Sequence, residues 1–206
     1  MRGTYSHIPA ENVSIETEEI DGDYYIKLKG EMRFTALFGR NLVLRREISM
    51  KYLGDELTVN DVITNDGFVD GEYYLMYHVN LGYPLLCEDT KLTVDTVESI
   101  PLNDTCDMDR WTMFEKPTPG RPEECYFHTL KEGKGIKARV ENNTHAVSFI
   151  VDSKEFPYIL QWKSMACGDY VLGVEPVTTK TNPKIPNVIK AGESAKHSVT
   201  WIFEEK

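Results

Sequence analysis

The chain has 206 residues, of which 41% are hydrophobic, and its formal net charge at pH 7 is −10. The acidic balance and the lack of any basic run exclude a nucleic-acid-binding class, because phosphate contacts depend on clustered Lys and Arg side chains. No apolar stretch is long enough to span a bilayer and no signal-peptide core opens the chain, so we expect a cytoplasmic protein that does not bind membranes.

Short strand-like segments follow one another along almost the whole chain. Turn signals such as Asp21-Gly22 and Ala191-Gly192 separate them, and no segment sustains a helical apolar period for three turns. The pattern predicts an all-β, antiparallel sandwich that forms a single domain over residues 1–206. We expect strands at 24–28, 33–38, 42–48, 57–64, 73–81, 91–97, 126–130, 137–142, 146–151, 158–163, 170–177 and 198–203.

The expected strand over residues 73–81 has one apolar face and one polar face. Alternate residues on a strand point to opposite sides, so the odd-numbered residues, from Tyr73 to Leu81, form a continuous apolar face. His78 and Asn80 then emerge together on the other face.

Two stretches lack strand character. Residues 103–124 are polar, contain three prolines and carry Trp111 and Phe114, which predicts a long loop or flap. Two interpretations of this segment remain open: a functional loop, or a surface loop without a function of its own. Residues 179–187 form a second extended connection.

Three polar side chains stand on the later strands. His128 lies opposite Cys125 and Phe127, and it is a candidate for a site-lining position. Gln161 and Lys163 share one strand face, where they either hydrogen-bond a ligand or form an ordinary polar face.

The expected strand over residues 170–177 presents a carboxylate. Leu172 and Val174 take the buried face, whereas Glu175 shares its face with Gly173, which leaves room for a molecule to approach. An imidazole at His78 and a carboxylate at Glu175, both on strands, are the minimal equipment for general acid–base chemistry.

No metal or cofactor is expected. The four cysteines are widely spaced and make no Cys-x-x-Cys pair, which favours free thiols over disulfides. No two of the five histidines have the spacing of a ligand pair on a common element, so we expect no metal site.

An ordered set of motifs resembles the aldose 1-epimerase (galactose mutarotase-like) superfamily, and a little-characterised bacterial branch of it above all. The resemblance covers essentially the whole chain. Its motifs are Tyr-His-Val-Asn-Leu-Gly-Tyr-Pro-Leu-Leu at 77–86, Gln-Trp-Lys at 161–163, Val-Leu-Gly-Val-Glu-Pro at 171–176 and Ala-Gly-Glu-Ser at 191–194, together with the opening segment at 3–12.

The resemblance implies a β-supersandwich with a sugar site on a concave sheet face. Glu175 matches the base that removes the proton from the anomeric hydroxyl, and His78 matches the acid that protonates the ring oxygen. This isomerase chemistry opens and recloses the ring of a monosaccharide or modified aldose without a cofactor. Asn80, His128, Gln161 and Lys163 are the expected substrate-binding residues, and strand parity predicts that all except His128 line one face with His78 and Glu175.

The chain departs from the superfamily pattern at its start. Members usually carry roughly a hundred further residues before this point, including an Arg used in sugar binding, so the chain resembles the C-terminal two-thirds of such a protein. A second His, commonly in a His-Gly pair, is expected where Arg2 and Gly3 stand. Arg2 is therefore included among the expected substrate-binding positions.

Three functional classes remain open. The first is a carbohydrate epimerase, and the second is a non-catalytic carbohydrate-binding protein that retains the sugar cleft. The third is an oligomeric structural module, because a shortened sandwich exposes sheet edges that a second copy can cover as a homo-oligomer.

Overall fold

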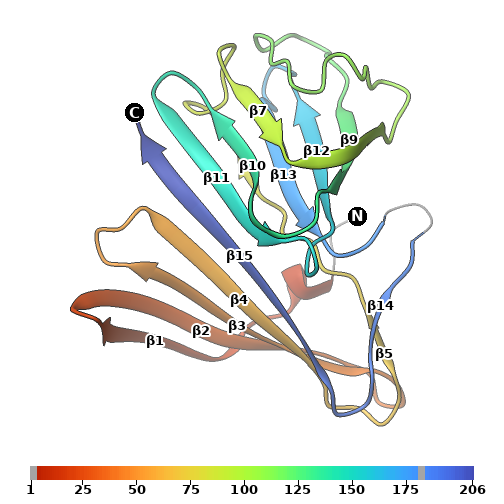
Figure 1. The fold of residues 1–206 in the computed structure, drawn as a ribbon. Coiled ribbons are helices and arrows are strands. Elements are labelled where there is room, and N and C mark those ends of the chain that lie inside the picture. The colour runs from red at the N-terminus through yellow and green to blue at the C-terminus, as the bar shows by residue number, and fades with distance from the viewer. Residues whose placement is uncertain (1–3, 181–183) are drawn as a thin grey trace. The chain divides into compact units, whose positions relative to one another are not determined.

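The computed structural model describes residues 4–180 and 184–206, which form two compact units. Of the described residues, unit 1 comprises 4–74 and 185–200, and unit 2 comprises 75–180, 184 and 201–206. Apart from the single helical turn η1 (Thr4–His7), the regular elements of the described residues are all β-strands (Figure 1). The prediction of an all-β, antiparallel fold is confirmed, whereas the single domain over residues 1–206 stays a prediction.

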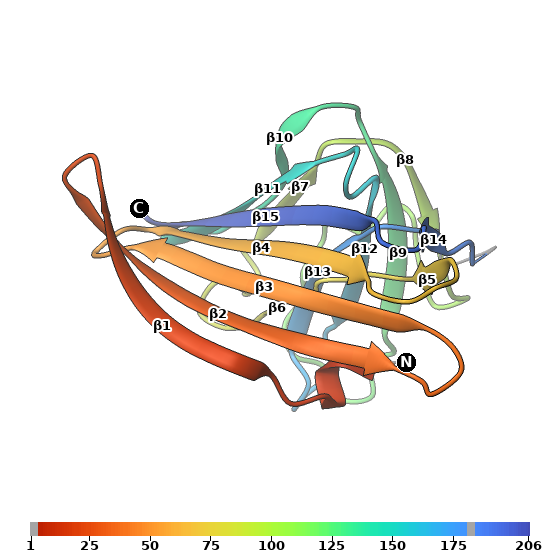
Figure 2. The same cartoon turned by 90° about the horizontal axis from the view of Figure 1, so that it is seen from below.

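Unit 1 is built on long antiparallel strands that lie side by side in the order β1-β2-β3-β4-β15 (Figure 2). The last strand contributes its residues 194–200 to this unit. A separate pair joins β5 (Gly71–Tyr73) to β14 (Asn187–Ile189). The long strands are β1 (Glu11–Ile20), β2 (Asp23–Thr35), β3 (Asn41–Lys51), β4 (Glu56–Asn65) and β15 (Ser194–Glu205).

The edge strand β1 was missed in the sequence. Its segment is rich in Glu, which is depleted in strands, and nearly all of its residues are exposed. Antiparallel pairing to β2 holds it in place, and Lys29 Nζ lies 2.7 Å from Glu16 Oε2 across that pair. Because this strand buries almost nothing, its sequence carries no hydrophobic alternation from which to predict it.

Unit 2 contains two antiparallel sheets (Figure 1). One has the order β15-β11-β10-β7, in which β15 contributes residues 201–205. The other has the order β6-β13-β12-β9-β8 and carries the residues that matter below. The bounds are β6 (Asn80–Leu81), β7 (Lys91–Val94), β8 (Thr96–Pro101), β9 (Glu124–Leu130), β10 (Lys134–Glu141), β11 (His145–Asp152), β12 (Tyr158–Ser164) and β13 (Val171–Val177).

Aromatic side chains form much of the core of unit 2. The Tyr77 ring lies 5.3 Å from the Phe156 ring and 6.2 Å from the Trp201 ring, between ring centroids. Phe149 also contacts Trp201, at 6.3 Å, and all four side chains are buried. Edge-to-face packing of this kind adds to the hydrophobic stabilisation that burial itself supplies.

The structure corrects the predicted strand over residues 73–81. It is divided into β5 and β6, and the intervening residues run beside β13 in extended form: Tyr77 N–H donates to Pro176 O, and Val174 N–H donates to Val79 O, both at 3.0 Å. The alternation survives, since Tyr73 and Tyr77 are buried and His78 is exposed.

The predicted strand over residues 91–97 is also two strands. It divides at Asp95 into β7 and β8, which belong to different sheets of unit 2. The long segment between β8 and β9 contains no strand, as predicted. Within the described residues, no helix has the length and apolar character that crossing a membrane requires.

Candidate active site

Glu175 stands in the middle of β13, between β12 and the extended segment that ends in β6. Its backbone pairs with Leu160 on one side. On the other side, Gly173 pairs with Asn80, and continuing this antiparallel register by two residues places His78 directly across from Glu175. Two residues that are far apart in the sequence thereby become cross-strand neighbours.

The His78 and Glu175 side chains meet on one face of the sheet. His78 Nδ1 lies 3.3 Å from Glu175 Oε1, and the exposed fractions of the two side chains are 39% and 2%. The imidazole is thus open to solvent, while the carboxylate is shielded from it. Among the described residues, no group donates a hydrogen bond to Glu175 Oε1.

Burial changes the acidity of Glu175. Desolvation disfavours the charged carboxylate and raises the pKa of Glu175 to about 7. A carboxylate with this pKa exchanges a proton readily near neutral pH, which is the property of a general base.

Gly173 keeps the space beside the carboxylate open. A Cβ atom at this position would lie 2.9 Å from Glu175 Oε1 and 3.2 Å from the Cβ of Trp162. The sequence-based expectation that Gly173 leaves room next to Glu175 therefore agrees with the geometry. Asn80, its cross-strand partner, points to the same face and is exposed.

Gln161 and Lys163 do not share the face of Glu175. Glu175 pairs with Leu160, whereas Gln161 pairs with Val174 and Lys163 pairs with Leu172. Paired residues point to the same side of a sheet, so Gln161 and Lys163 lie on the opposite face, where both are buried. The expectation that one face carries all five residues is wrong for these two.

The loop between β8 and β9 covers that opposite face. Gln161 Nε2 donates to Trp111 O at 2.7 Å. Lys163 Nζ donates to Arg110 O at 3.0 Å and to Met113 O at 3.2 Å. Both side chains are therefore engaged by the protein itself.

His128 belongs to this same buried face. Because Gln161 uses its amide N–H to reach Trp111, its Oε1 accepts from His128 Nε2 at 3.0 Å. His128 Nδ1 then accepts from the Ser99 hydroxyl at 2.8 Å. Burial lowers the pKa of His128 to about 4, so the ring is neutral and satisfied on both nitrogens.

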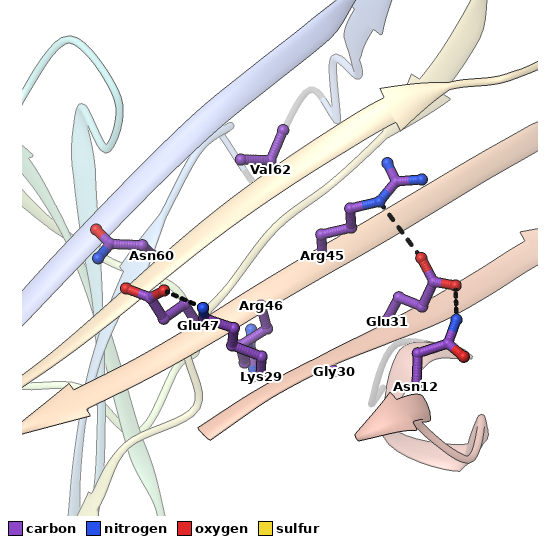
Figure 3. Close-up of a pocket in the computed structure, with 9 residues that line it drawn as sticks. All are labelled: Asn12, Lys29, Gly30, Glu31, Arg45, Arg46, Glu47, Asn60 and Val62. Atoms are coloured by element: carbon purple, nitrogen blue, oxygen red, sulfur yellow. Dashed lines mark hydrogen bonds and ion pairs between the residues drawn. The ribbon is translucent and has the colours of Figure 1, made fainter. Parts of the chain in front are cut away.

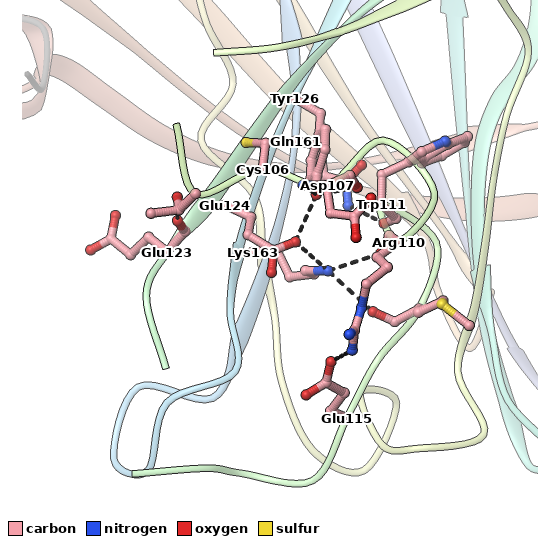
Figure 4. Close-up of polar contacts among 12 residues, drawn as sticks. Cys106, Asp107, Arg110, Trp111, Glu115, Glu123, Glu124, Tyr126, Gln161 and Lys163 are labelled. Atoms are coloured by element: carbon pink, nitrogen blue, oxygen red, sulfur yellow. Dashed lines mark hydrogen bonds and ion pairs between the residues drawn. The ribbon is translucent and has the colours of Figure 1, made fainter. Parts of the chain in front are cut away.

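A buried ion pair continues the network (Figure 4). Lys163 Nζ lies 2.7 Å from Glu124 Oε2, and both side chains are at most 2% exposed. Arg121 Nη2 and the Tyr126 hydroxyl also contact the Glu124 carboxylate, at 2.8 and 2.7 Å. Although burial acts in the opposite sense, the hydrogen bonds from Lys163 and Tyr126 lower the pKa of Glu124.

Sequence reasoning missed Glu124 and Trp162. Glu124 was assigned to the loop, yet it begins β9 and pairs with Lys163. Trp162 was not among the expected site residues, and its pairing with Gly173 puts it on the face of Glu175, where it is half-buried. Only the register between strands reveals either role. Arg2 lies outside the described residues.

A hollow of about 390 Å³ lies on the β1–β4 sheet of unit 1 (Figure 3). Its basic side chains are all in ion pairs: Arg45 Nε lies 3.3 Å from Glu31 Oε2, Lys29 Nζ lies 3.7 Å from Glu47 Oε2, and Arg46 Nη2 lies 2.6 Å from Asp61 Oδ2. The described residues contain no group of three His, Cys, Asp or Glu side chains that could hold a metal ion.

Solved structures share this fold. A "putative aldose 1-epimerase" from Klebsiella pneumoniae superposes with a TM-score of 0.91 at 22% identity, covering 98% of this chain and 56% of that one. A "galactose mutarotase-like protein" from Clostridium acetobutylicum gives a TM-score of 0.66 at 14% identity, with coverages of 94% and 67%. A "putative aldose 1-epimerase" from Escherichia coli gives 0.64 at 12%, with 94% and 69%.

The fold is therefore the antiparallel sandwich of the galactose mutarotase-like proteins, as the motifs predicted. The chain spans only 56% of the length of the Klebsiella protein. No curated protein matches it. A family model matches residues 1–194. The chain thus belongs to the family described as "Domain of unknown function (DUF4432)".

Proposed function

We propose that the chain is a carbohydrate-binding, aldose 1-epimerase-like isomerase in which Glu175 is the general base and His78 the general acid. The observation that carries this proposal is the buried Oε1 of Glu175, which receives no hydrogen bond from the described residues and has His78 Nδ1 at 3.3 Å. A buried acceptor without a donor is rare in proteins. The anomeric hydroxyl of a bound aldose supplies that donor.

The closeness of the two groups suits the chemistry. The anomeric hydroxyl oxygen and the ring oxygen of a pyranose are both bonded to C1, so an acid and a base a few ångström apart reach them together. Glu175 takes the proton from the anomeric hydroxyl, and His78, in its protonated form, gives one to the ring oxygen. The C1 to ring-oxygen bond breaks, the aldehyde forms, and rotation about C1–C2 followed by the reverse transfers closes either anomer.

Asn80 joins this proposal as a substrate-binding residue. It stands on the same face as Glu175, is exposed, and follows His78 by two residues along the chain. An amide both donates and accepts hydrogen bonds, so it matches sugar hydroxyls in either role. Gln161, Lys163 and His128 face the other side of the sheet, and direct contact with a sugar at Glu175 is not proposed for them.

The test is the rate of anomer interconversion of glucose and galactose, measured by NMR exchange spectroscopy on the whole chain. Glu175→Gln and His78→Asn should each lower the enzyme-dependent rate by roughly a hundredfold to ten-thousandfold, the usual contribution of a positioned proton-transfer group. Glu132→Gln in an exposed turn and His145→Asn on β11 serve as matched controls, for which we expect unchanged rates.

The pH profile gives a second readout. Because the pKa of Glu175 is raised to about 7, the base loses its charge below that pH, and kcat/KM should fall about tenfold per pH unit on the acid side. A Glu175→Gln chain that keeps the full rate would refute the assignment. Sugar binding by the wild-type chain without any acceleration would favour the non-catalytic carbohydrate-binding alternative.

A further inference from the structure

Two rows of cross-strand neighbours cross the face that carries Glu175. The register places Asn80, Gly173, Trp162 and Cys125 in one row. It places Glu175, Leu160 and Phe127 in the next row, with His78 across from Glu175. Trp162 and Glu175 are thus diagonal neighbours, and Gly173 is the position at the corner between them.

Space, and not backbone conformation, accounts for the glycine at position 173. Its φ lies outside the left-handed region, in which Gly22 and Gly168, for example, are found, so an L-residue could adopt this backbone. A Cβ atom would nevertheless meet Glu175 Oε1 at 2.9 Å and the Trp162 Cβ at 3.2 Å. Any side chain would therefore press against the Glu175 carboxylate and the Cβ of Trp162.

Trp162 differs from the other two tryptophans. The rings of Trp111 and Trp201 pack against His128 and against Tyr77 and Phe149. Among the described residues, no aromatic ring packs on Trp162, which is half-buried. Its indole N–H donates to Glu123 Oε2 at 2.8 Å, which fixes the orientation of the ring.

From these contacts we infer that Trp162 is the stacking wall of a pyranose subsite whose floor is Gly173, an inference that rests on the proposed function. Diagonal neighbours on a sheet stand roughly 7–8 Å apart, a separation over which one sugar ring contacts both side chains. The apolar C–H face of the sugar packs on the indole, and its anomeric oxygen lies at Glu175 Oε1. The bare backbone of Gly173 lies beneath the ring.

The charges around this subsite define the class of ligand. Neither row contains Lys or Arg, and the carboxylate of Glu123 stands beside the indole. A sugar phosphate would bring its negative charge next to Glu123 and Glu175 without a Lys or Arg from either row. The subsite therefore fits an uncharged aldopyranose.

Equilibrated D-galactose and D-glucose are the probes that separate this inference from the proposed function. They keep the anomeric hydroxyl that donates to Glu175, and because their anomers are already at equilibrium in solution, their binding is measured apart from catalysis. We expect saturation-transfer NMR and calorimetry to detect binding to the wild-type chain. Trp162→Leu should weaken that binding roughly tenfold, the value of a lost aromatic contact together with part of its buried area.

Three further variants test the roles of Gly173 and of the Trp162 ring in sugar binding. Gly173→Ala should weaken binding to a similar degree by filling the floor, and Trp162→Phe should weaken it less than Trp162→Leu because a ring is kept. Phe203→Leu, a change at a 45% exposed aromatic residue of β15, is the control and should leave binding unchanged. Circular dichroism checks that each variant is folded.

The outcomes are distinct. Absence of glucose and galactose binding, equal binding by folded Trp162→Leu and wild-type chains, or tighter binding of glucose 6-phosphate than of glucose would overturn the subsite. Anomer interconversion that depends on Glu175 but not on Trp162 would overturn it and leave the proposed function standing. Sugar binding that depends on Trp162 in a chain without isomerase activity would support the subsite and refute the proposed catalysis.

Discussion

At the scale of single residues, burial of the Glu175 carboxylate costs stability at neutral pH. The side chain is 2% exposed, and desolvation raises its pKa from 4.5 to about 7. A carboxyl group whose pKa is higher in the folded state than in the unfolded state binds more protons when folded over that range. Stability due to this group is therefore complete below about pH 4.5 and is lost as the pH rises through 7.

Glu175→Gln should reveal this cost. The neutral amide does not ionise, so this position adds no pH dependence to the stability of the variant, whereas the wild-type chain loses stability as Glu175 ionises. The difference in free energy of unfolding, variant minus wild type, should therefore rise by about 3 kcal/mol between pH 4.5 and pH 8, at 1.36 kcal/mol per pKa unit. Urea unfolding at several pH values measures it, with Glu132→Gln as the exposed control. A difference that does not change with pH would contradict the raised pKa.

At the scale of elements, β9 and β12 use buried polar side chains to hold the loop between β8 and β9. Lys163 links the two strands to the loop, because its ammonium contacts the Glu124 carboxylate and two carbonyl oxygens of the loop. Desolvation lowers the pKa of Lys163 despite its partner Glu124. A buried ion pair contributes modest net stability, but removing one member leaves the other uncompensated.

Lys163→Met should therefore lower the free energy of unfolding by about 3 kcal/mol, since Glu124 stays buried without its nearest cation. Lys131→Met is the matched control: its ammonium is 3.5 Å from Asp95 in a pair that is 60% and 37% exposed, and the loss should stay below about 1 kcal/mol. Chemical unfolding at pH 7 compares the two. Equal losses would mean that the buried network does not stabilise the fold.

At the scale of the whole molecule, the proposed sugar contacts come from one part of the chain. His78, Asn80, Trp162, Gly173 and Glu175 all belong to unit 2. The hollow on unit 1 offers three basic side chains, Arg45, Lys29 and Arg46, which already pair with Glu31, Glu47 and Asp61. Charge pairing of this kind leaves little electrostatic attraction for a ligand.

Titration of the 15N-labelled chain with D-galactose should accordingly shift the backbone amide signals of residues 78–80, 160–162 and 173–175 most strongly. Signals from 29–31 and 45–47, which line the hollow of unit 1, are the internal reference and should move little. Larger shifts around that hollow would place the sugar on unit 1 and contradict both proposals.

The sequence by itself determined the fold class, because alternation within a strand has a period of two and needs no partner to be seen. The family resemblance came from the ordered motifs, and their match to His78 and Glu175 singled out that pair. Leu172 and Val174 are buried as expected, and Tyr73 and Tyr77 alternate with exposed neighbours.

Only the tertiary structure decided which side chains share a face across strands. Alternation divides the residues of each strand into two faces. The register of β12 against β13 decides which residues of β12 lie on the same side of the sheet as Glu175. A shift of that register by one residue would move Gln161 and Lys163 to the side of Glu175. Gln161 and Lys163 are buried away from Glu175 because the loop places backbone carbonyl oxygens over them, at Trp111, Arg110 and Met113. Those partners lie about fifty residues away in the chain, so no local sequence pattern predicts these contacts.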